Sequence, residues 1–232
     1  MSGAATSTVL EPRTGQAVLV AEGATGEITI RYHYAAGGAY PAGLFAPHTS
    51  RFTRIAEGLA AEAQSFDGAT VEEIASHVAA LFTYGHPEER YYDGFDELPH
   101  LCDMAVGSCV DINFYFIAML RAAGIEAGYV TGAFFPAEKR DWCNDMHCWV
   151  VIREGDLLRE WDIAHHLKLG QKTVAAGLNP KPGFRLPVSY GMGLDLPALD
   201  LRDIKLMSEP MWLVEGALSD AEPQIKLTGG PQ

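Results

Sequence analysis

The chain has 232 residues, a formal net charge of −13 and a pI near 4.9. This acidic balance argues against a nucleic-acid partner, which needs clustered Lys and Arg, and four cysteines are too few for a disulfide scaffold. The longest apolar stretch, Phe114–Leu120, is much shorter than the roughly 20 residues that a membrane span requires. Because the N-terminus shows no secretory signal, we expect a cytoplasmic protein with reduced thiols and no membrane partner.

Residues 1–48 are predicted to form an N-terminal region of strands and a loop. The first 15 residues are small and polar, and we expect them to be frayed. The apolar Ala17–Val20 is followed by Glu27–Tyr34, which alternates strictly between polar and apolar residues. This period of two predicts a half-buried strand. The glycines and prolines of residues 35–48 predict a crossing loop.

Two helices are predicted next. The first runs from about Arg51 to Gln64, with Ser50 as a candidate cap. The second opens at Thr70 with the Ser/Thr-x-x-Glu pattern of a capping box. Its apolar stripe, which includes Ile74 and Val78, is expected to face the core.

A third helix is predicted from about Cys109 to Ala123, ending at Gly124, a residue that favours a left-handed C-terminal cap. It is apolar on nearly all sides, so we expect it to be the buried central helix. The preceding residues 85–107 are rich in Gly, Pro, Asp and Tyr, and a loop of this length is often functional.

Three strands are predicted to follow, at Ala127–Phe134, His147–Arg153 and Leu157–Asp162, and the last two are joined by the hairpin signal Glu154-Gly155-Asp156. From residue 169 onward no long periodic element is visible. Residues 169–232 are therefore predicted to form a C-terminal extension that wraps the core and ends in a loose tail.

Three of these positions carry a catalytic pattern. Cys109 stands at a helix N-terminus, where backbone N–H groups and the helix dipole favour a thiolate. A two-residue turn at Glu154-Gly155 would set His147 opposite Asp162, and one at Gly155-Asp156 would make them diagonal neighbours on the same face. A three-residue loop would separate them. A thiol, an imidazole and a carboxylate form a nucleophile, base and orienter set.

The residues around these positions resemble the transglutaminase-like core, a compact relative of the papain-type cysteine hydrolases. The resemblance extends from about residue 70 to 166. It is carried by Gly107-x-Cys109-x-Asp111, Met119–Ala127, Tyr129–Gly132, His147-x-Trp149-Val150 and Trp161-Asp162.

This resemblance implies an α+β fold, with a central nucleophile helix packed on an antiparallel sheet and a catalytic core at residues 49–168. It also implies that Cys109 is the nucleophile, His147 the general base and acid, and Asp162 the orienter. The implied chemistry is acyl transfer through a thioester from a peptide, protein or small amide substrate. The acyl acceptor, water or an amine, stays open, as does the oligomeric state.

Several alternatives remain at the level of single residues. Glu160 would replace Asp162 if the register shifted, and Tyr91 and Tyr92 are the candidates for an oxyanion side chain. Asp162 is followed by Ile163-Ala164-His165-His166 and not by the Pro-Thr type of continuation common in the family. We expect His165 and His166 to cap the strand end in a solvated turn.

The remaining cysteines invite a zinc site with nearby histidines, but their spacings match no standard site, and no metal or cofactor is expected. Cys148 should point to the strand face away from His147 and serve in packing, and Cys102 is a minor candidate for a regulatory disulfide with Cys109. Two other functions stay open. The run Cys109–Asn113 resembles that of arylamine N-acetyltransferases, although no Arg-Gly-Gly precedes it, and the fold is also compatible with a non-catalytic binding module.

Overall fold

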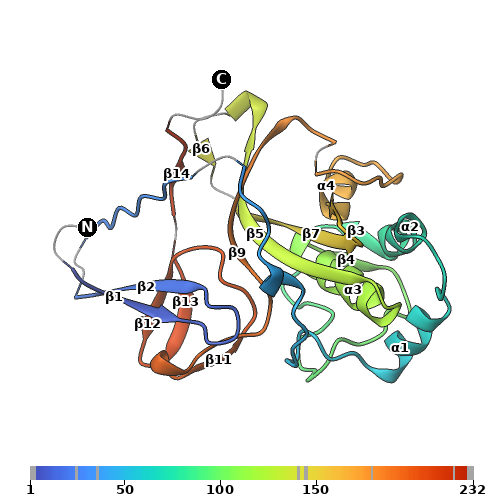
Figure 1. The fold of residues 1–232 in the computed structure, drawn as a ribbon, viewed down its shortest axis with the longest axis horizontal. Helices are drawn as coiled ribbons and strands as arrows, with labels where there is room; N and C mark the ends of the chain where they lie inside the picture. The colour runs from blue at the N-terminus through green and yellow to red at the C-terminus, as the bar shows by residue number, and fades with distance from the viewer. Residues whose placement is uncertain are drawn as a thin grey trace.

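The computed structural model describes residues 4–23, 26–34, 37–139, 142–143, 146–178, 180–221 and 223–228. At its centre lies a four-stranded antiparallel sheet in the order β8-β7-β5-β9 (Figure 1). These strands span Leu157–Trp161 (β8), Met146–Glu154 (β7), Glu126–Pro136 (β5) and Gly183–Tyr190 (β9). Helices pack beside this sheet, so the fold class is α+β with the central helix against an antiparallel sheet, as predicted.

The helix α3 (Cys109–Ala122) is buried along almost its whole length. It packs against β5 and β7 and is surrounded by three other helices, α1 (Glu57–Gln64), α2 (Val71–Leu81) and α4 (Ile163–Lys168). A helix with no polar face is stable only when all of its sides are covered, which is the arrangement in Figure 1. The predicted central helix is confirmed, and Gly124 follows it with a φ of 77°.

The capping box at Thr70 is confirmed. The helix that precedes it begins later in the chain than predicted. Thr70 Oγ1 accepts from the backbone N–H of Glu73, whose carboxylate accepts from the N–H of Thr70. The preceding helix begins only at Glu57, because Ser50 caps a turn instead. Ser50 Oγ accepts from the N–H of Phe52 at 3.1 Å, and this local bond closes the turn before a helix can start.

The strand predicted at residues 27–34 was wrong, because this segment has no regular secondary structure. Alternation produces a strand only where a neighbouring strand supplies hydrogen bonds, and Tyr32 is 72% exposed. The N-terminal strands are instead β1 (Ala5–Leu10), which was expected to be frayed, and β2 (Ala17–Glu22), which pair antiparallel.

Regular structure continues far into the C-terminal segment, where an extended wrap and loose tail were predicted. Its first strand, β9, is part of the central sheet and pairs with β5. The boundary at residue 169 stays a prediction. The smaller elements are β3 (Phe82–Tyr84), β4 (Ala105–Gly107), β6 (Trp142–Cys143), β10 (Leu194–Leu196), β11 (Leu201–Ile204), β12 (Met211–Val214), β13 (Ala217–Asp220) and β14 (Ile225–Lys226), with 3-10 turns at Ala42–Phe45, Ala137–Lys139 and Pro197–Leu199.

The two ends of the chain pack together, because Val9 of β1 and Val18 of β2 contact the apolar cluster of β10 and β11. Gln16 and Tyr190 tie the N-terminal hairpin to the end of β9, since the side chain of Gln16 bonds the backbone N–H and C=O of Tyr190 at 2.9 and 2.8 Å. Among the described residues, no helix combines the length and apolar character needed to span a membrane.

Candidate active site

Cys109 is the first residue of α3, and its position depends on the residues just before it. Ser108 is the N-cap, and its hydroxyl accepts from the N–H of Val110 at 3.3 Å, while Asp111 Oδ2 accepts from the N–H of Ser108 at 2.7 Å. A Cβ on Gly107 would lie 2.8 Å from the ring of Phe82, so only glycine fits there without a shift. The capping box and this close approach together set where the thiol emerges.

Arg90, which sequence reasoning missed, supports the same helix end. Its Nη1 donates to Asp111 Oδ2 at 2.6 Å and to Ser108 Oγ at 3.0 Å. Asp111 is only 1% exposed, and a buried carboxylate requires a cationic or multiple hydrogen-bonding partner. An acidic residue on an otherwise apolar helix was the signal in the sequence, but nothing local identified Arg90, in the loop before α3, as its partner.

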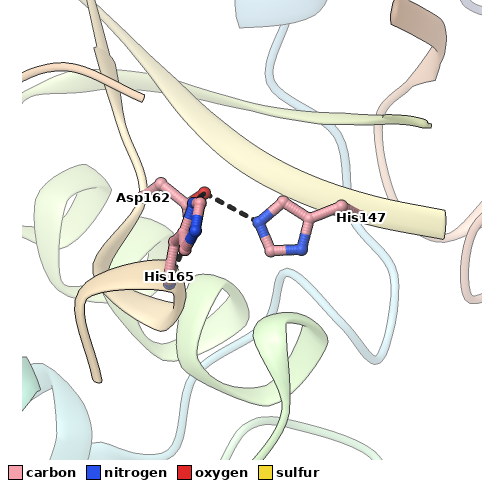
Figure 2. Close-up of side chains that lie close together, drawn as sticks. All are labelled: His147, Asp162 and His165. Atoms are coloured by element: carbon pink, nitrogen blue, oxygen red, sulfur yellow. Dashed lines mark hydrogen bonds and ion pairs between the residues drawn. The ribbon is translucent and has the colours of Figure 1, made fainter. Parts of the chain in front are cut away.

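His147 and Asp162 meet across the β7–β8 hairpin. Glu154 pairs with Leu157, so the connection is the two-residue turn Gly155-Asp156, the diagonal-neighbour arrangement among the predicted alternatives. His147 Nε2 lies 2.7 Å from Asp162 Oδ2. The dashed line between these two side chains in Figure 2 marks the contact. The Asp162 side chain is fully buried, and that of His147 is 12% exposed. The structure thus brings this predicted pair together at the edge of the sheet nearest Cys109.

The thiol of Cys109 interacts with both Cys148 and His147. A hydrogen bond from Cys148 and the contact with His147 lower the pKa of Cys109 well below its usual range, although burial opposes the shift. Burial also disfavours the charged form of His147, but the carboxylate of Asp162 outweighs it and raises the pKa of His147 to about 9. Both directions favour a thiolate paired with an imidazolium over two neutral groups.

Cys148 is buried, as predicted, but it is more than a packing residue. Burial raises its pKa well above the usual range, so it remains a thiol and its S–H donates to Cys109. Asn113 Nδ2 in turn donates to Cys148 Sγ at 3.3 Å. The predicted site therefore gains two residues from α3 and β7 that stabilise negative charge on Cys109.

The expectation that His165 and His166 lie in a solvated turn was wrong. Helix α4 begins directly after Asp162 and turns both side chains inward, so that they are 4% and 7% exposed. Asp162 Oδ1 accepts from the N–H of His165 at 2.9 Å, and His166 Nδ1 donates to the carbonyl oxygen of Asp162 at 2.8 Å.

Arg185 completes the surroundings of Asp162. Its Nη2 donates to Asp162 Oδ2 at 2.5 Å and to His165 Nδ1 at 3.0 Å. Burial alone would raise the pKa of Asp162, but His147 and Arg185 lower it to about 2. Sequence reasoning missed this residue. The single basic residue between the apolar Phe184 and Leu186 was the available signal.

The alternative acid, Glu160, and the candidate oxyanion side chains, Tyr91 and Tyr92, have partners of their own. Glu160 accepts a hydrogen bond from the hydroxyl of Tyr40, away from His147. Tyr91 and Tyr92 pack within the aromatic core, where the ring of Tyr92 lies 5.5 Å from that of Phe114. No disulfide joins Cys102 to Cys109, since Cys102 is exposed and Cys109 is buried.

His147, Asp162 and His165 also have the composition of a metal site, because one ligand atom from each lies within 4.8 Å of the others. Arg185, however, donates to both Asp162 and His165 from within this group. A guanidinium at that position places positive charge where a cation would bind, so the arrangement does not fit a metal.

Comparison with protein families gives a match over part of the chain. Residues 53–156 match the family model of the transglutaminase-like superfamily, a range that includes Cys109 and His147 and ends before Asp162 and Arg185. A solved structure of a proposed cysteine protease from Cytophaga hutchinsonii is 19% identical, with a TM-score of 0.35. The match covers 60% of this chain and 53% of that protein, or about half its length. The curated proteins contain no significant match. The family match supports a transglutaminase-like core at residues 53–156, which is slightly less than half of the chain.

Proposed function

We propose that this protein is a cysteine-dependent hydrolase or acyltransferase that cleaves or exchanges an amide bond, with Cys109, His147 and Asp162 as its catalytic residues. The observation that carries the proposal is the 2.7 Å contact between His147 Nε2 and Asp162 Oδ2 beside a thiol at a helix N-terminus. Because Nε2 is engaged by Asp162, the ring nitrogen Nδ1 is the one left to pair with Cys109.

In the first half of the reaction, the Cys109 thiolate attacks the carbonyl carbon of the amide. The S–C bond forms, and the C–N bond breaks as His147 gives its proton to the departing amine. In the second half, water or another amine attacks the thioester, and His147 takes the proton of this nucleophile. The carbon–sulfur bond then breaks, and the thiolate–imidazolium pair is restored.

The negative oxygen formed in each half-reaction needs hydrogen-bond donors. The backbone N–H groups in the first turn of α3 supply partial positive charge beside Cys109. The burial of Cys109, which is 9% exposed, restricts water near that oxygen. An amide in a peptide, a protein or a small molecule is the substrate class that this arrangement suits.

The test compares the native chain with two cysteine variants in assays with a fluorogenic peptide amide and with amine incorporation. Cys109→Ala is expected to lose activity by about 10³-fold or more, because the thioester cannot form. Cys102→Ala, which removes an exposed thiol, serves as the matched control and is expected to keep full activity.

Intact mass spectrometry with an electrophilic warhead gives an independent measurement. We expect one adduct, at Cys109, in the folded protein. Activity that survives in Cys109→Ala, or a folded protein that forms no adduct at Cys109, would contradict the proposal and favour the binding-module alternative.

The acetyltransferase alternative rests on the run Cys109–Asn113, and the structure provides another reason for its two polar residues. Asp111 closes the capping box and binds Arg90, and Asn113 bonds Cys148. Both residues are therefore explained by the local support of Cys109.

A further inference from the structure

Arg185 reaches the proposed site from a part of the chain that lies outside the family match. It is carried by β9, in register with Phe134 of β5, and its side chain is 4% exposed. Its guanidinium carbon lies 4.9 Å from the centre of the Phe134 ring and 5.4 Å from that of Trp149. Nη2 is also within hydrogen-bond distance of the carbonyl oxygen of Leu178, so its two N–H groups are shared among three acceptors. These contacts hold the guanidinium in one place.

The position of Arg185 balances the charge of a buried cluster. With a thiolate on Cys109 and an imidazolium on His147, the four groups Cys109, His147, Asp162 and Arg185 carry two negative and two positive charges. In the thioester intermediate, Cys109 and His147 are both neutral, and Asp162 and Arg185 still cancel. Without Arg185 the cluster would hold one uncompensated negative charge in both states, and burial makes such a charge costly.

Without a counter-charge, Asp162 would lower the free-energy cost of its burial by binding a proton. A protonated carboxyl presents an O–H to its neighbours, and it is a weaker acceptor for the N–H of His147. The imidazole would then lose the contact that holds its orientation and tautomer.

Building on the proposed function, we propose that Arg185 is a positioning residue that keeps Asp162 ionised and directed at His147 through both halves of the reaction. Its one Nη2 atom contacts Asp162 Oδ2, the oxygen that His147 uses, so the guanidinium also fixes the rotation of the carboxylate. The strand β9 is thereby part of the catalytic unit.

The other titratable groups around Asp162 support this assignment. His165 on α4 accepts from Arg185, and burial lowers the pKa of His165 to about 4, so it is neutral when it does so. His166 contacts the backbone oxygen of Asp162, and Glu160 on β8 accepts a hydrogen bond from Tyr40. Of the groups described around the carboxylate, His147 on β7 and Arg185 on β9 are the cations.

The experiment uses full-length variants. Arg185→Met removes the charge and keeps the length of the side chain, and Arg185→Lys keeps the charge without the planar donor. Arg121→Met is the matched control, because Arg121 is a half-buried arginine whose Nε donates to the carbonyl oxygen of Ala127, at the far end of α3. For each, kcat and KM are measured against pH on the peptide amide, with the rate of Cys109 alkylation and near-ultraviolet circular dichroism.

For Arg185→Met we expect kcat to fall by about 10- to 100-fold, with KM within about twofold of the native value. The acid limb of the pH profile should move up by about one unit or more, since Asp162 then binds a proton more readily. Arg185→Lys is expected to restore the acid limb and only part of kcat. Arg121→Met is expected to match the native protein in both.

Three outcomes would overturn the inference. The first is a native kcat and pH profile in Arg185→Met. The second is an acid limb in Arg185→Lys that moves as far as in Arg185→Met. The third is a loss of kcat in Arg121→Met as large as that in Arg185→Met. If Arg185→Met does not fold, Arg185→Gln takes its place with the same expectation. Activity that survives in Cys109→Ala would instead reject the proposed function, so the two failures are distinguishable.

Discussion

Cys109 takes its ionisation from neighbours on several elements. Cys148 and His147 lower its pKa, and Asn113 supports Cys148 from the next turn of α3. His147 owes its own raised pKa to Asp162, which overcomes the effect of burial. The side chains thus depend on one another in a chain of contacts, and a change in any one is expected to be felt at the thiol.

The pH dependence follows from these shifts. The lowered pKa of Cys109 extends the thiolate–imidazolium pair toward lower pH, and the raised pKa of His147 sets its upper limit at about pH 9. We expect Cys109 to react with iodoacetamide at a nearly constant rate between pH 6 and 8. An unstructured cysteine peptide should instead gain reactivity steeply as pH approaches about 8.5. Peptide mass spectrometry after timed labelling measures both, and parallel profiles would contradict the ion pair.

Folding stability should also depend on pH, through the ionisation of His147 and Asp162. His147 has a higher pKa in the folded state, so its contribution is fully present below about pH 6.5 and is lost as pH rises through about 9. Asp162 has a lower pKa in the folded state, and its contribution is lost as pH falls toward about 2.

At the scale of elements, the N-terminus of α3 is the part that positions Cys109, the proposed nucleophile. The capping box between Ser108 and Asp111 is closed by Arg90, and it is buried. The chain holds a second capping box, between Thr70 and Glu73 at the start of α2, and that one is exposed and remote from the thiol. The two boxes allow a matched comparison.

Ser108→Ala and Thr70→Ala should each lower the free energy of unfolding by about 1 kcal/mol, because each removes an N-cap hydroxyl. Only Ser108→Ala should also slow the alkylation of Cys109, since only that helix start carries the thiol. Urea unfolding and timed labelling measure the two effects. Equal labelling rates in both variants would show that the cap does not position Cys109.

At the scale of the whole molecule, the C-terminal segment completes the structure around Asp162. β9 lies beside β5 at a point where the two backbones approach closely, because a Cβ on Gly132 would lie 1.9 Å from the carbonyl oxygen of Leu186. Leu186 is the residue after Arg185. A side chain at Gly132 would therefore force β9, and the guanidinium with it, away from Asp162.

Gly132→Ala is expected to lower stability by about 1–3 kcal/mol and to shift the acid limb of activity in the same direction as Arg185→Met. Gly38→Ala is the control, because a Cβ there meets no atom within 4 Å. Thermal unfolding and the pH profile of kcat measure the two effects. A native pH profile in a folded Gly132→Ala protein would contradict this prediction, because it would show that the position of β9 does not affect the ionisation of Asp162.

Patterns within single segments predicted much of this protein. The apolar composition of α3 indicated a buried helix, and either two-residue turn considered for the β7–β8 hairpin would place His147 and Asp162 on one face. The strict alternation of residues 27–34, in contrast, predicted a strand that does not form. Periodicity describes which way side chains would face, and the presence of a hydrogen-bonding neighbour strand is a separate condition that the segment itself does not contain.

The sequence by itself determined the elements that carry Cys109, His147 and Asp162, because helix caps and the apolar patterns of helices and strands are local properties. Only the tertiary structure decided what surrounds them. Arg185 lies 23 residues beyond Asp162, and Arg90 lies 21 residues before Asp111. The identity of such a partner depends on how strands and loops pack. A buried carboxylate needs one because leaving it without a counter-charge has a large free-energy cost.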